Sequence, residues 1–386
     1  MPRVLFLASQ PYFQWRGSPI RLGFDVRAIA ENGHAVDFLT LPIGEDRPVE
    51  GVRILRAPNL FFAKRISIGP SPLKLAFDAI MFVEALGMIC RRHYDVVHGV
   101  EDCGFLAWML ARLAGAKCVF EKHSDAGSYK KGLIIGLYRR VERFVMRHAD
   151  AVIGTGPGLV RQVEELGCGT PAFCVSDIPS SLVEPDAEGT RAARRALEKE
   201  PGEVVATYVG SFASYQGIDL LFESIPVAVK AAPELRFAII GGTPEEIAAR
   251  TAQLRAAGCG DRVSCVGKKP PDELPCWLAA SDILLSPRIQ GLNTPLKLLD
   301  YLKVSRGIVA TDHPANRLIL DESVARLAPP EPAAFGAAVA ALARDPAGRH
   351  ALAARCRALV DERYNFRVFR EGLREVYGRV LASSSK

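Results

Sequence analysis

Short apolar runs alternate along this chain with longer segments whose apolar residues recur every three or four positions. Such runs are typical of buried strands, and the 3.6-residue period is typical of helices that pack one face on a sheet. In the first half the pattern predicts strands at residues 3–9, 35–41, 52–56, 95–98, 117–121 and 151–155. Helices are predicted at residues 20–32, 73–92, 105–114, 129–148 and 159–166. This alternation indicates a parallel sheet covered by helices on both faces.

The alternation starts again after a polar stretch with interspersed Pro and Gly, which ends in a charged helix predicted at residues 191–199. Strands are predicted at residues 203–209, 235–240, 262–266, 283–285, 307–311 and 324–327. Helices are predicted at residues 218–232, 272–280, 315–321, 332–344, 348–362 and 366–381, and another begins at Pro244. The chain should therefore form two parallel-sheet domains that face one another across a cleft. They would cover residues 1–178 and 203–363, with a linker at 179–202, and a C-terminal helix at 364–386 would pack back toward the first domain.

The stretch at residues 281–312 is the most informative part of the second domain. A buried strand is followed by a polar loop and a helix that should open near Asn293 and Thr294, with Pro295 in its first turn. Arg288 and Lys297 lie close by in the sequence. A helix N-terminus beside a strand's carboxyl end, with two cations, predicts an anion site. An ordinary strand–loop–helix connection is the alternative, and the pattern leaves both open.

Composition narrows the class of protein. The chain has 386 residues, 49% hydrophobic and 24% charged, which suits two or three soluble globular domains. No apolar run is long enough to span a membrane, and the first residues look like a strand rather than a signal peptide. The nine cysteines are scattered, as in proteins of a reducing cytosol. The net charge of +6 suits an anionic partner, but no nucleic-acid-binding motif is present.

In the first domain, polar residues cluster where predicted strands end, which is where ligands bind in such sheets. The loop after the first strand contains Arg16, Gly17 and Ser18, and the strand at 117–121 is followed by His123. Glu101, Asp102 and Asp125 also follow strands. Ordinary solvated loops would explain the same residues.

Two further features suggest contact with anionic lipid head groups. The helix at 129–148 has a basic stripe opposite an apolar face, and an irregular segment combines exposed-looking aromatics with cations. The basic stripe consists of Arg139, Arg143 and Arg147, with Lys130, Lys131 and Arg140 close by. The apolar face consists of Leu133, Leu137, Val141, Phe144 and Val145. The irregular segment contains Phe61, Phe62, Lys64 and Arg65. A normally packed helix with a solvated charged face is an equally good interpretation.

The motifs of several enzyme classes are missing. The chain has no G-x-S-x-G, no Walker A sequence and no HExxH, and its Gly154, Gly156 and Gly158 lack the context of a dinucleotide fingerprint. Two domains with polar loops and one anion site suit a two-substrate transferase that uses a phosphorylated donor.

The ordered motifs resemble glycosyltransferase family 4, whose members are retaining enzymes with the GT-B fold. The resemblance rests on SDILLSPRIQGLNTPLKLLDYL followed by GIVAT, on TYVGSFASYQGIDLLFESI, and on LRFAIIGG and RVSCVGKKPPDEL. In the first half, PYFQWRGSPIRLGFDVRAIAENGHAVDFLT, YDVVHGVED, VFEKHSD and HADAVIGTGPGLVRQVEELG are similar in the same order. The resemblance covers nearly the whole chain. It is strongest to a bacterial subgroup with an RGSP motif early and an NTPLK motif late, and it implies two Rossmann-like domains.

The resemblance also implies a role for individual residues. The donor diphosphate would be held by Gly210, Ser211 and the backbone at Asn293, Thr294, Pro295 and Leu296. The nucleobase would lie at Gly267 and Lys268, and Asp300 stands where the family has a glutamate that binds the donor ribose. His123 would lie near the transferred sugar, and Arg16, Gly17 and Ser18 would form the loop that closes on phosphate and acceptor.

This chain departs from the family at three positions. Ser211 and Gln216 replace an arginine and a lysine that neutralise the leaving diphosphate, and Leu292 replaces the first glutamate of the E-x7-E pair. We expect Arg288 and Lys297 to supply the missing charge, because stabilising the leaving group is the main task of such a site.

The expected activity is hexosyl transfer with retention from a nucleotide-diphosphate sugar to a glycan or lipid-linked acceptor, in envelope polysaccharide or glycolipid biosynthesis. No metal or other cofactor is expected, since cations and a helix dipole would replace it. The partners would be the donor, the acceptor and an anionic membrane surface, with no nucleic acid. The protein would be cytoplasmic, either free or peripheral on the inner face of the cell membrane. A GT-B sugar-nucleotide epimerase and a non-catalytic sugar-nucleotide-binding scaffold are the alternatives.

Overall fold

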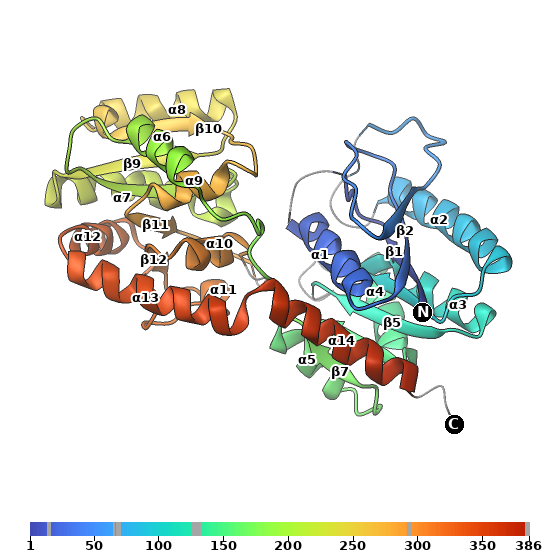
Figure 1. Ribbon diagram of the computed structural model, residues 1–386. Coiled ribbons are helices and arrows are strands. Elements are labelled where there is room, and N and C mark those ends of the chain that lie inside the picture. Colours follow the sequence, from blue (N-terminus) through green and yellow to red (C-terminus); the bar gives the residue numbers. More distant parts are fainter. Residues whose placement is uncertain (14–16, 65, 67–70, 125–132, 292–294, 383–386) are drawn as a thin grey trace. The chain divides into compact units, whose positions relative to one another are not determined.

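The computed structural model describes residues 1–386 except 14–16, 65, 67–70, 125–132, 292–294 and 383–386. The chain forms two compact units (Figure 1). Unit 1 consists of residues 1–178 and 366–386, and unit 2 consists of residues 179–365. The residues expected to form a linker, 179–202, belong to unit 2. Within the described residues, none of the helices combines the length and apolar character needed to cross a membrane.

Unit 1 contains a parallel sheet in the order β3-β2-β1-β4-β5-β6-β7. Its strands are β1 (Arg3–Ala8), β2 (Ala35–Thr40), β3 (Val52–Arg56), β4 (Val96–Val100), β5 (Lys117–Lys122), β6 (Ala151–Gly154) and β7 (Ala172–Cys174). Its helices are α1 (Gly17–Glu31), α2 (Pro72–Arg91), α3 (Gly104–Ala114), α4 (Leu133–His148), α5 (Pro157–Glu164) and α14 (Phe366–Ala382), with a 3₁₀ turn, η1 (Glu101–Cys103). The strand order reverses direction between β1 and β4, and in such sheets ligands bind at the carboxyl ends of the strands beside this point.

Unit 2 has a second parallel sheet, in the order β10-β9-β8-β11-β12-β13. Its strands are β8 (Val204–Val209), β9 (Leu235–Ile240), β10 (Val263–Gly267), β11 (Ile283–Ser286), β12 (Gly307–Thr311) and β13 (Arg326–Ala328). Its helices are α6 (Ala187–Leu197), α7 (Ile218–Ala231), α8 (Pro244–Ala256), α9 (Leu274–Ala279), α10 (Lys297–Val304), α11 (Pro314–Arg317), α12 (Pro332–Ala343) and α13 (Pro346–Arg363). Here the order reverses between β8 and β11.

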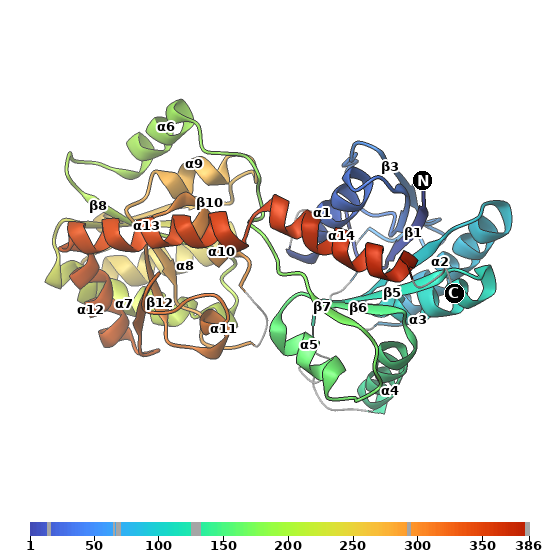
Figure 2. The same cartoon turned by 60° about the horizontal axis from the view of Figure 1, so that its bottom comes forward.

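Strand alternation divides the interior of unit 1 into two layers. Leu5, Val97 and Phe120 pack with α2, α3 and α4 on one face of the sheet. Their neighbours in sequence point the other way, so that the rings of His98 and Phe6 lie 4.6 Å apart on the face covered by α1 and α14. Figures 1 and 2 both show α1 and α14 running side by side over this face.

Several elements differ from the prediction; for example, α6 begins at Ala187 rather than at residue 191, and α11 ends at Arg317 rather than at residue 321. β7 was not expected, because its three residues are too few to form a recognisable pattern. In α4, Leu137 is 61% exposed, whereas Val141, Phe144 and Val145 of the predicted apolar face pack in the core together with Met146. Helix α10 begins at Lys297 with Leu296 at its N-cap, later than predicted, while Asn293 and Thr294 lie outside the described residues.

Candidate functional site

In unit 2, glycines bring the loops at the carboxyl ends of the strands into close contact. Gly217 has φ +73°, and a Cβ there would lie 1.8 Å from the carbonyl oxygen of Pro287. The backbone N–H groups of Ile289 and Gln290 both donate to the Tyr215 carbonyl, at 3.2 and 3.3 Å. The loop at 210–217 after β8 is therefore fixed against the segment after β11. Gly210 (φ +153°) belongs to this loop, and its N–H donates a hydrogen bond to the Ile240 carbonyl at 3.0 Å.

This contact brings Arg288 and Lys297 together. Arg288 is only 8% exposed, its Nε donates to the Gln290 carbonyl at 2.8 Å, and its guanidinium lies 5.5 Å from the ring centre of Tyr215. The ammonium of Lys297 donates to Oε1 of Gln216 at 3.1 Å and lies 4.5 Å from the ring centre of Tyr208. Among the described residues, no carboxylate forms an ion pair with either cation. A buried and a partly buried cation without a carboxylate partner form a site that favours an anion.

Burial lowers the pKa of both side chains. Burial and the neighbouring Arg288 lower the pKa of Lys297 to about 7. Burial also lowers the pKa of Arg288 from its usual value, although a guanidinium stays charged at physiological pH. An arriving phosphate group would stabilise the charged form of Lys297 and raise its pKa again.

Buried polar groups hold the Arg288 segment in place. The Thr311 hydroxyl at the end of β12 donates to the Arg288 carbonyl. The Asn316 amide, which is fully buried, donates to the Thr311 carbonyl at 2.9 Å and lies 3.2 Å from the Ser286 hydroxyl. A satisfied buried network of this kind fixes the local backbone, and here it fixes the residue that bears the guanidinium.

The remaining donor-site candidates are spread around the same edge of unit 2. Gly267 ends β10 with φ +69°, and its carbonyl accepts from Gly241 at 2.9 Å, while Lys268 and Ser211 are exposed. Pro295 and Leu296 directly precede α10. Asp300 is already engaged, since its two oxygens accept from the backbone N–H and the hydroxyl of Ser180, each at 2.7 Å. Burial raises the pKa of Asp300 to about 6.

In unit 1, His123 follows β5 and is held by two glutamates. Its backbone N–H donates to Oε1 of Glu101, which also accepts from the N–H of Ser124 at 2.7 Å. Its ring Nε2 lies 2.7 Å from Oε1 of Glu121. Glu101 has φ +51°, an uncommon conformation for a residue with a side chain, and such strain is often found at functional sites. The carboxylate of Glu101 therefore positions the loop that bears His123.

The other candidates in unit 1 have different outcomes. Arg16 lies outside the described residues, and Gly17 and Ser18 begin helix α1. Asp102 forms an ion pair with Lys74 and accepts from the Tyr138 hydroxyl at 2.7 Å, which suggests a structural role. Asp125 lies outside the described residues.

Asp25, Glu121 and His123 are close enough to hold a metal ion, with ligand atoms within 4.8 Å of one another. The guanidinium of Arg21 already lies among these groups, with its Nε 2.6 Å from Glu121 and 3.8 Å from Asp25. A divalent cation would have to bind beside this fixed positive charge. The donor set therefore fits an ion-pair network better than a metal site.

Several site residues were missed by the sequence analysis: Arg21, Asp25, His98, Glu121 and Tyr377 in unit 1, and Tyr208, Tyr215, Thr311 and Asn316 in unit 2. The charged pair Glu121-Lys122 at the end of an otherwise apolar strand was the one visible signal, because buried charges are rare without a specific reason. The others have no local pattern.

Two domain families match this chain: residues 21–175 match the Glycosyl transferase 4-like domain, and residues 203–345 match Glycosyl transferases group 1. A 2-deoxystreptamine glucosyltransferase from Streptomyces kanamyceticus is 29% identical over 287 residues, which are 68% of this chain and 73% of that protein.

Solved structures resemble the whole chain. Sucrose-phosphate synthase from Thermosynechococcus elongatus has a TM-score of 0.79 at 18% identity, covering 99% of this chain and 100% of that one. HepE from Anabaena, solved in complex with UDP-glucose, has a TM-score of 0.73 at 13% identity, covering 97% and 99%. WaaG, a glycosyltransferase involved in lipopolysaccharide biosynthesis, has a TM-score of 0.67 at 14% identity, covering 97% and 100%. At these identities the likeness concerns the fold.

Proposed function

The chain belongs to the glycosyltransferases of the GT-B fold, and from this premise we propose that it transfers a hexose with retention from a nucleotide-diphosphate donor. The acceptor would be a glycan or a lipid-linked sugar in envelope polysaccharide or glycolipid biosynthesis. The observation that supports the donor class is the pair Arg288 and Lys297, a buried and a partly buried cation with no carboxylate partner among the described residues.

The diphosphate leaving group needs positive charge that is already in place when its bond to the sugar breaks. Arg288 presents a planar fork that suits two phosphate oxygens, and Lys297 presents a compact charge. Lys297 contacts Gln216, the position at which the family has a lysine. We therefore propose that Lys297 places its ammonium where the relatives place another side chain, which compensates for the substitution at residue 216.

Retention requires no nucleophile from the protein in this proposal. The expelled phosphate oxygen would take the proton of the acceptor hydroxyl on the face from which the phosphate leaves. The protein would contribute by holding both reactants in line and by excluding water. His123 would contact the transferred sugar, and Gly267 with Lys268 would contact the nucleobase.

The test measures transfer from a panel of nucleotide sugars that starts with UDP-glucose, the ligand of the structurally similar HepE. Arg288→Ala and Lys297→Ala should each lower kcat by about 10²–10³-fold, as expected for removal of a group that stabilises transition-state charge. Lys230→Ala, which removes an exposed lysine on α7, is the matched control and should have no effect. Unchanged turnover in both site variants would refute the assignment.

The same panel separates the alternatives. Donor binding without turnover across the acceptors would indicate a scaffold, and epimerised or hydrolysed donor without any acceptor would indicate an isomerase-type reaction. 2-Deoxystreptamine belongs among the acceptors, because the relative from Streptomyces kanamyceticus is named for it.

We propose in addition that unit 1 docks on anionic membranes. Leu60, Phe61 and Phe62 form an exposed apolar loop, in which Phe62 is 87% exposed, and Arg143 and Arg147 on α4 are also exposed. In flotation with anionic liposomes, the protein should float at low salt, and Phe62→Asp should lower the bound fraction. Leu318→Asp changes an exposed leucine in unit 2 and is the control. Absence of salt-sensitive flotation would contradict membrane docking.

A further inference from the structure

Glu121 is the centre of a buried hydrogen-bonded cluster beneath His123. It is fully buried near the end of β5, on the sheet face covered by α1 and α14. Oε1 accepts from Nε of Arg21 at 2.6 Å and lies 2.7 Å from Nε2 of His123. Oε2 lies 3.1 Å from Nε2 of His98. Three nitrogen atoms from three elements thus converge on one carboxylate.

The charge state of this cluster can be deduced from its surroundings. Burial alone would raise the pKa of Glu121, but Arg21, His123 and His98 outweigh it and lower the pKa well below its usual range. Burial and the charge of Glu121 raise the pKa of Asp25 well above its usual range. The cluster therefore holds an ionised Glu121 beside Asp25, which is harder to ionise than an ordinary aspartate. Asp177, at 3.0 Å, is a second acidic partner of Arg21.

An ionised Glu121 determines where the ring protons lie. A carboxylate only accepts hydrogen bonds, so Nε2 of His123, which lies 2.7 Å from Oε1, must carry a proton. The 3.1 Å contact between Nε2 of His98 and Oε2 is close, but it lacks the geometry of a hydrogen bond. Burial lowers the pKa of His98, and its Nδ1 lies 2.8 Å from the Tyr377 hydroxyl on α14. Close polar contacts therefore connect Tyr377, His98, Glu121 and His123.

We propose that Glu121 is a positioning residue for His123. It holds the proton of the ring on Nε2, so that Nδ1 accepts a hydrogen bond from a hydroxyl of the bound sugar. Tyr377 and His98 fix Glu121 from the other side, so that the C-terminal helix helps to orient the histidine. This inference rests on the proposed function, because it takes His123 to be the residue beside the transferred sugar.

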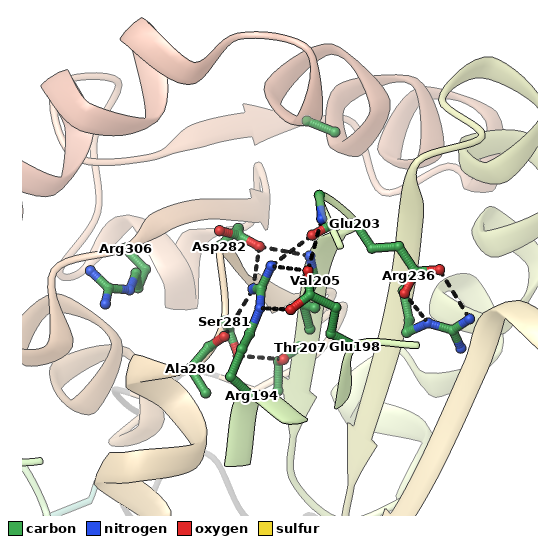
Figure 3. A network of polar contacts seen from close by, with 12 residues as sticks. Arg194, Glu198, Glu203, Val205, Thr207, Arg236, Ala280, Ser281, Asp282 and Arg306 are labelled. Atoms are coloured by element: carbon green, nitrogen blue, oxygen red, sulfur yellow. Dashed lines mark hydrogen bonds and ion pairs between the residues drawn. The ribbon is translucent and has the colours of Figure 1, made fainter. Parts of the chain in front are cut away.

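Glu121 differs from a second buried carboxylate of the protein in the kind of partners it has. This second carboxylate is Glu203, just before β8 in unit 2, and Arg236 binds it with two nitrogens at 2.8 and 3.1 Å (Figure 3). Its other contacts are Arg262 and the backbone N–H groups of Lys199 and Glu200. Glu121 has one close nitrogen from its arginine, and its remaining contacts are two histidine rings, one of which lies in the loop at the strand's carboxyl end.

The experiment combines nitrogen NMR of histidine with steady-state kinetics on the full chain. In the wild type the His123 ring should show the Nε2–H tautomer. Glu121→Gln should shift the ring toward a mixture of tautomers and lower kcat at least about tenfold, with little change in donor KM. Glu203→Gln is the matched control and should change neither the His123 spectrum nor kcat. Tyr377→Phe keeps the packing of the ring, removes only the hydroxyl, and should lower kcat less than Glu121→Gln.

The outcomes separate this inference from the proposed function. If His123→Ala leaves turnover unchanged, the role given to His123 fails, while the tautomer measurement still reports on Glu121. If Glu121→Gln and Tyr377→Phe both fold and leave the His123 tautomer and kcat as in the wild type, the positioning role is refuted. Should Glu121→Gln not fold, Tyr377→Phe decides alone, by the His98 and His123 ring spectra and kcat.

Discussion

If the proposed donor site is correct, Lys297 should make donor binding sensitive to pH. Its pKa is lowered to about 7 in the free protein, and a bound diphosphate would raise it because the anion stabilises the ammonium. Binding then takes up a proton when the pH lies above 7. We expect the affinity for UDP-glucose, whose pyrophosphate diester stays fully ionised, to fall as the pH rises from 7 to 8, by up to about tenfold per pH unit.

Isothermal titration at several pH values, in buffers of different ionisation enthalpy, measures both the affinity and the proton uptake. Lys297→Met should bind more weakly at pH 7 and lose the pH dependence. If Lys297→Met retains the wild-type slope, another group is responsible for it.

Asp300 should make unit 2 less stable as the pH rises. Folding raises its pKa from the usual 3.8 to about 6, so the folded state binds this proton more tightly than the unfolded state. The contribution to stability is therefore fully present below pH 3.8 and is lost as the pH rises to about 6, a loss of roughly 3 kcal/mol. Asp300→Asn cannot ionise and keeps an acceptor for the Ser180 N–H.

The difference in Tm between Asp300→Asn and the wild type should become more positive between pH 4 and pH 7, at roughly 2–4 °C per kcal/mol. Differential scanning calorimetry at both pH values tests this. An equal difference at the two pH values would mean that Asp300 does not change its protonation over this range.

Site residues next to a predicted strand–helix connection were easier to predict than site residues that only the folded chain brings together. Arg288 and Lys297 flank a predicted strand–helix connection, so they could be selected from the sequence, although their burial and their contacts with Tyr215 and Tyr208 could not. The Glu121 cluster joins α1, β4, β5 and α14, elements that are far apart in the sequence. No local pattern indicates that their polar side chains will meet.

At the scale of elements, Gly217 determines how two loops of unit 2 approach each other. Gly217→Ala would place a Cβ 1.8 Å from the Pro287 carbonyl oxygen at φ +73°. Gly258 has a similar φ of +71° with nothing within 4 Å of a Cβ, so Gly258→Ala measures the backbone strain alone. Gly217→Ala should cost roughly 1–3 kcal/mol more than Gly258→Ala, because it also displaces packed backbone.

Urea unfolding measures the stability of both variants, and UDP-glucose titration measures the effect on the site. Gly217→Ala should weaken donor binding because Arg288 lies in the displaced segment, while Gly258→Ala should bind like the wild type. Equal effects of the two substitutions on stability and binding would show that the close approach at Gly217 does not matter.

Most helices and strands could be predicted because their apolar periods are strong, and the bounds of β3, β9 and β12 match the prediction at both ends. The failures have local causes. Helix α10 begins at Lys297, just after Pro295, although Leu296 before it already has helical φ and ψ. Leu137 satisfies a helical period but faces solvent, whereas Val141, Phe144 and Val145 of the same predicted face pack in the core together with Met146.

At the scale of the whole molecule, the chain leaves unit 1 after Ile178 and returns to it at Phe366. The two sheets could be predicted from the renewed β–α alternation, because each sheet is built from segments that are contiguous in sequence. The sequence indicates less clearly that the last helix packs on the first domain, because an apolar helix face does not specify which domain it covers. The structure assigns that face to unit 1, where Phe369, Leu373, Val376, Tyr377 and Val380 are buried.

Removal of α14 should therefore unfold unit 1 and leave unit 2 folded. The guanidinium of Arg21 lies 5.0 Å from the Phe369 ring centre, and the Asn32 amide donates to the Arg370 carbonyl at 2.9 Å. Exposing five large apolar side chains costs on the order of 10 kcal/mol, which is comparable to the stability of a typical domain. Unit 2 retains its own core around Phe222, Phe237 and Phe335.

Hydrogen exchange measured by mass spectrometry on a chain that ends at Asn365 tests this division. Peptides from β1, β4 and α1 should exchange within seconds, whereas peptides from β8, β9 and α7 should keep their wild-type protection. A chain that ends at Ala382 keeps the whole of α14 and is the control. If protection fell equally in both units, the helix would stabilise the whole molecule; if it fell in neither, the buried face of α14 would contribute little to the fold. Selective loss in unit 1 is expected because all five buried side chains of the helix lie in that unit.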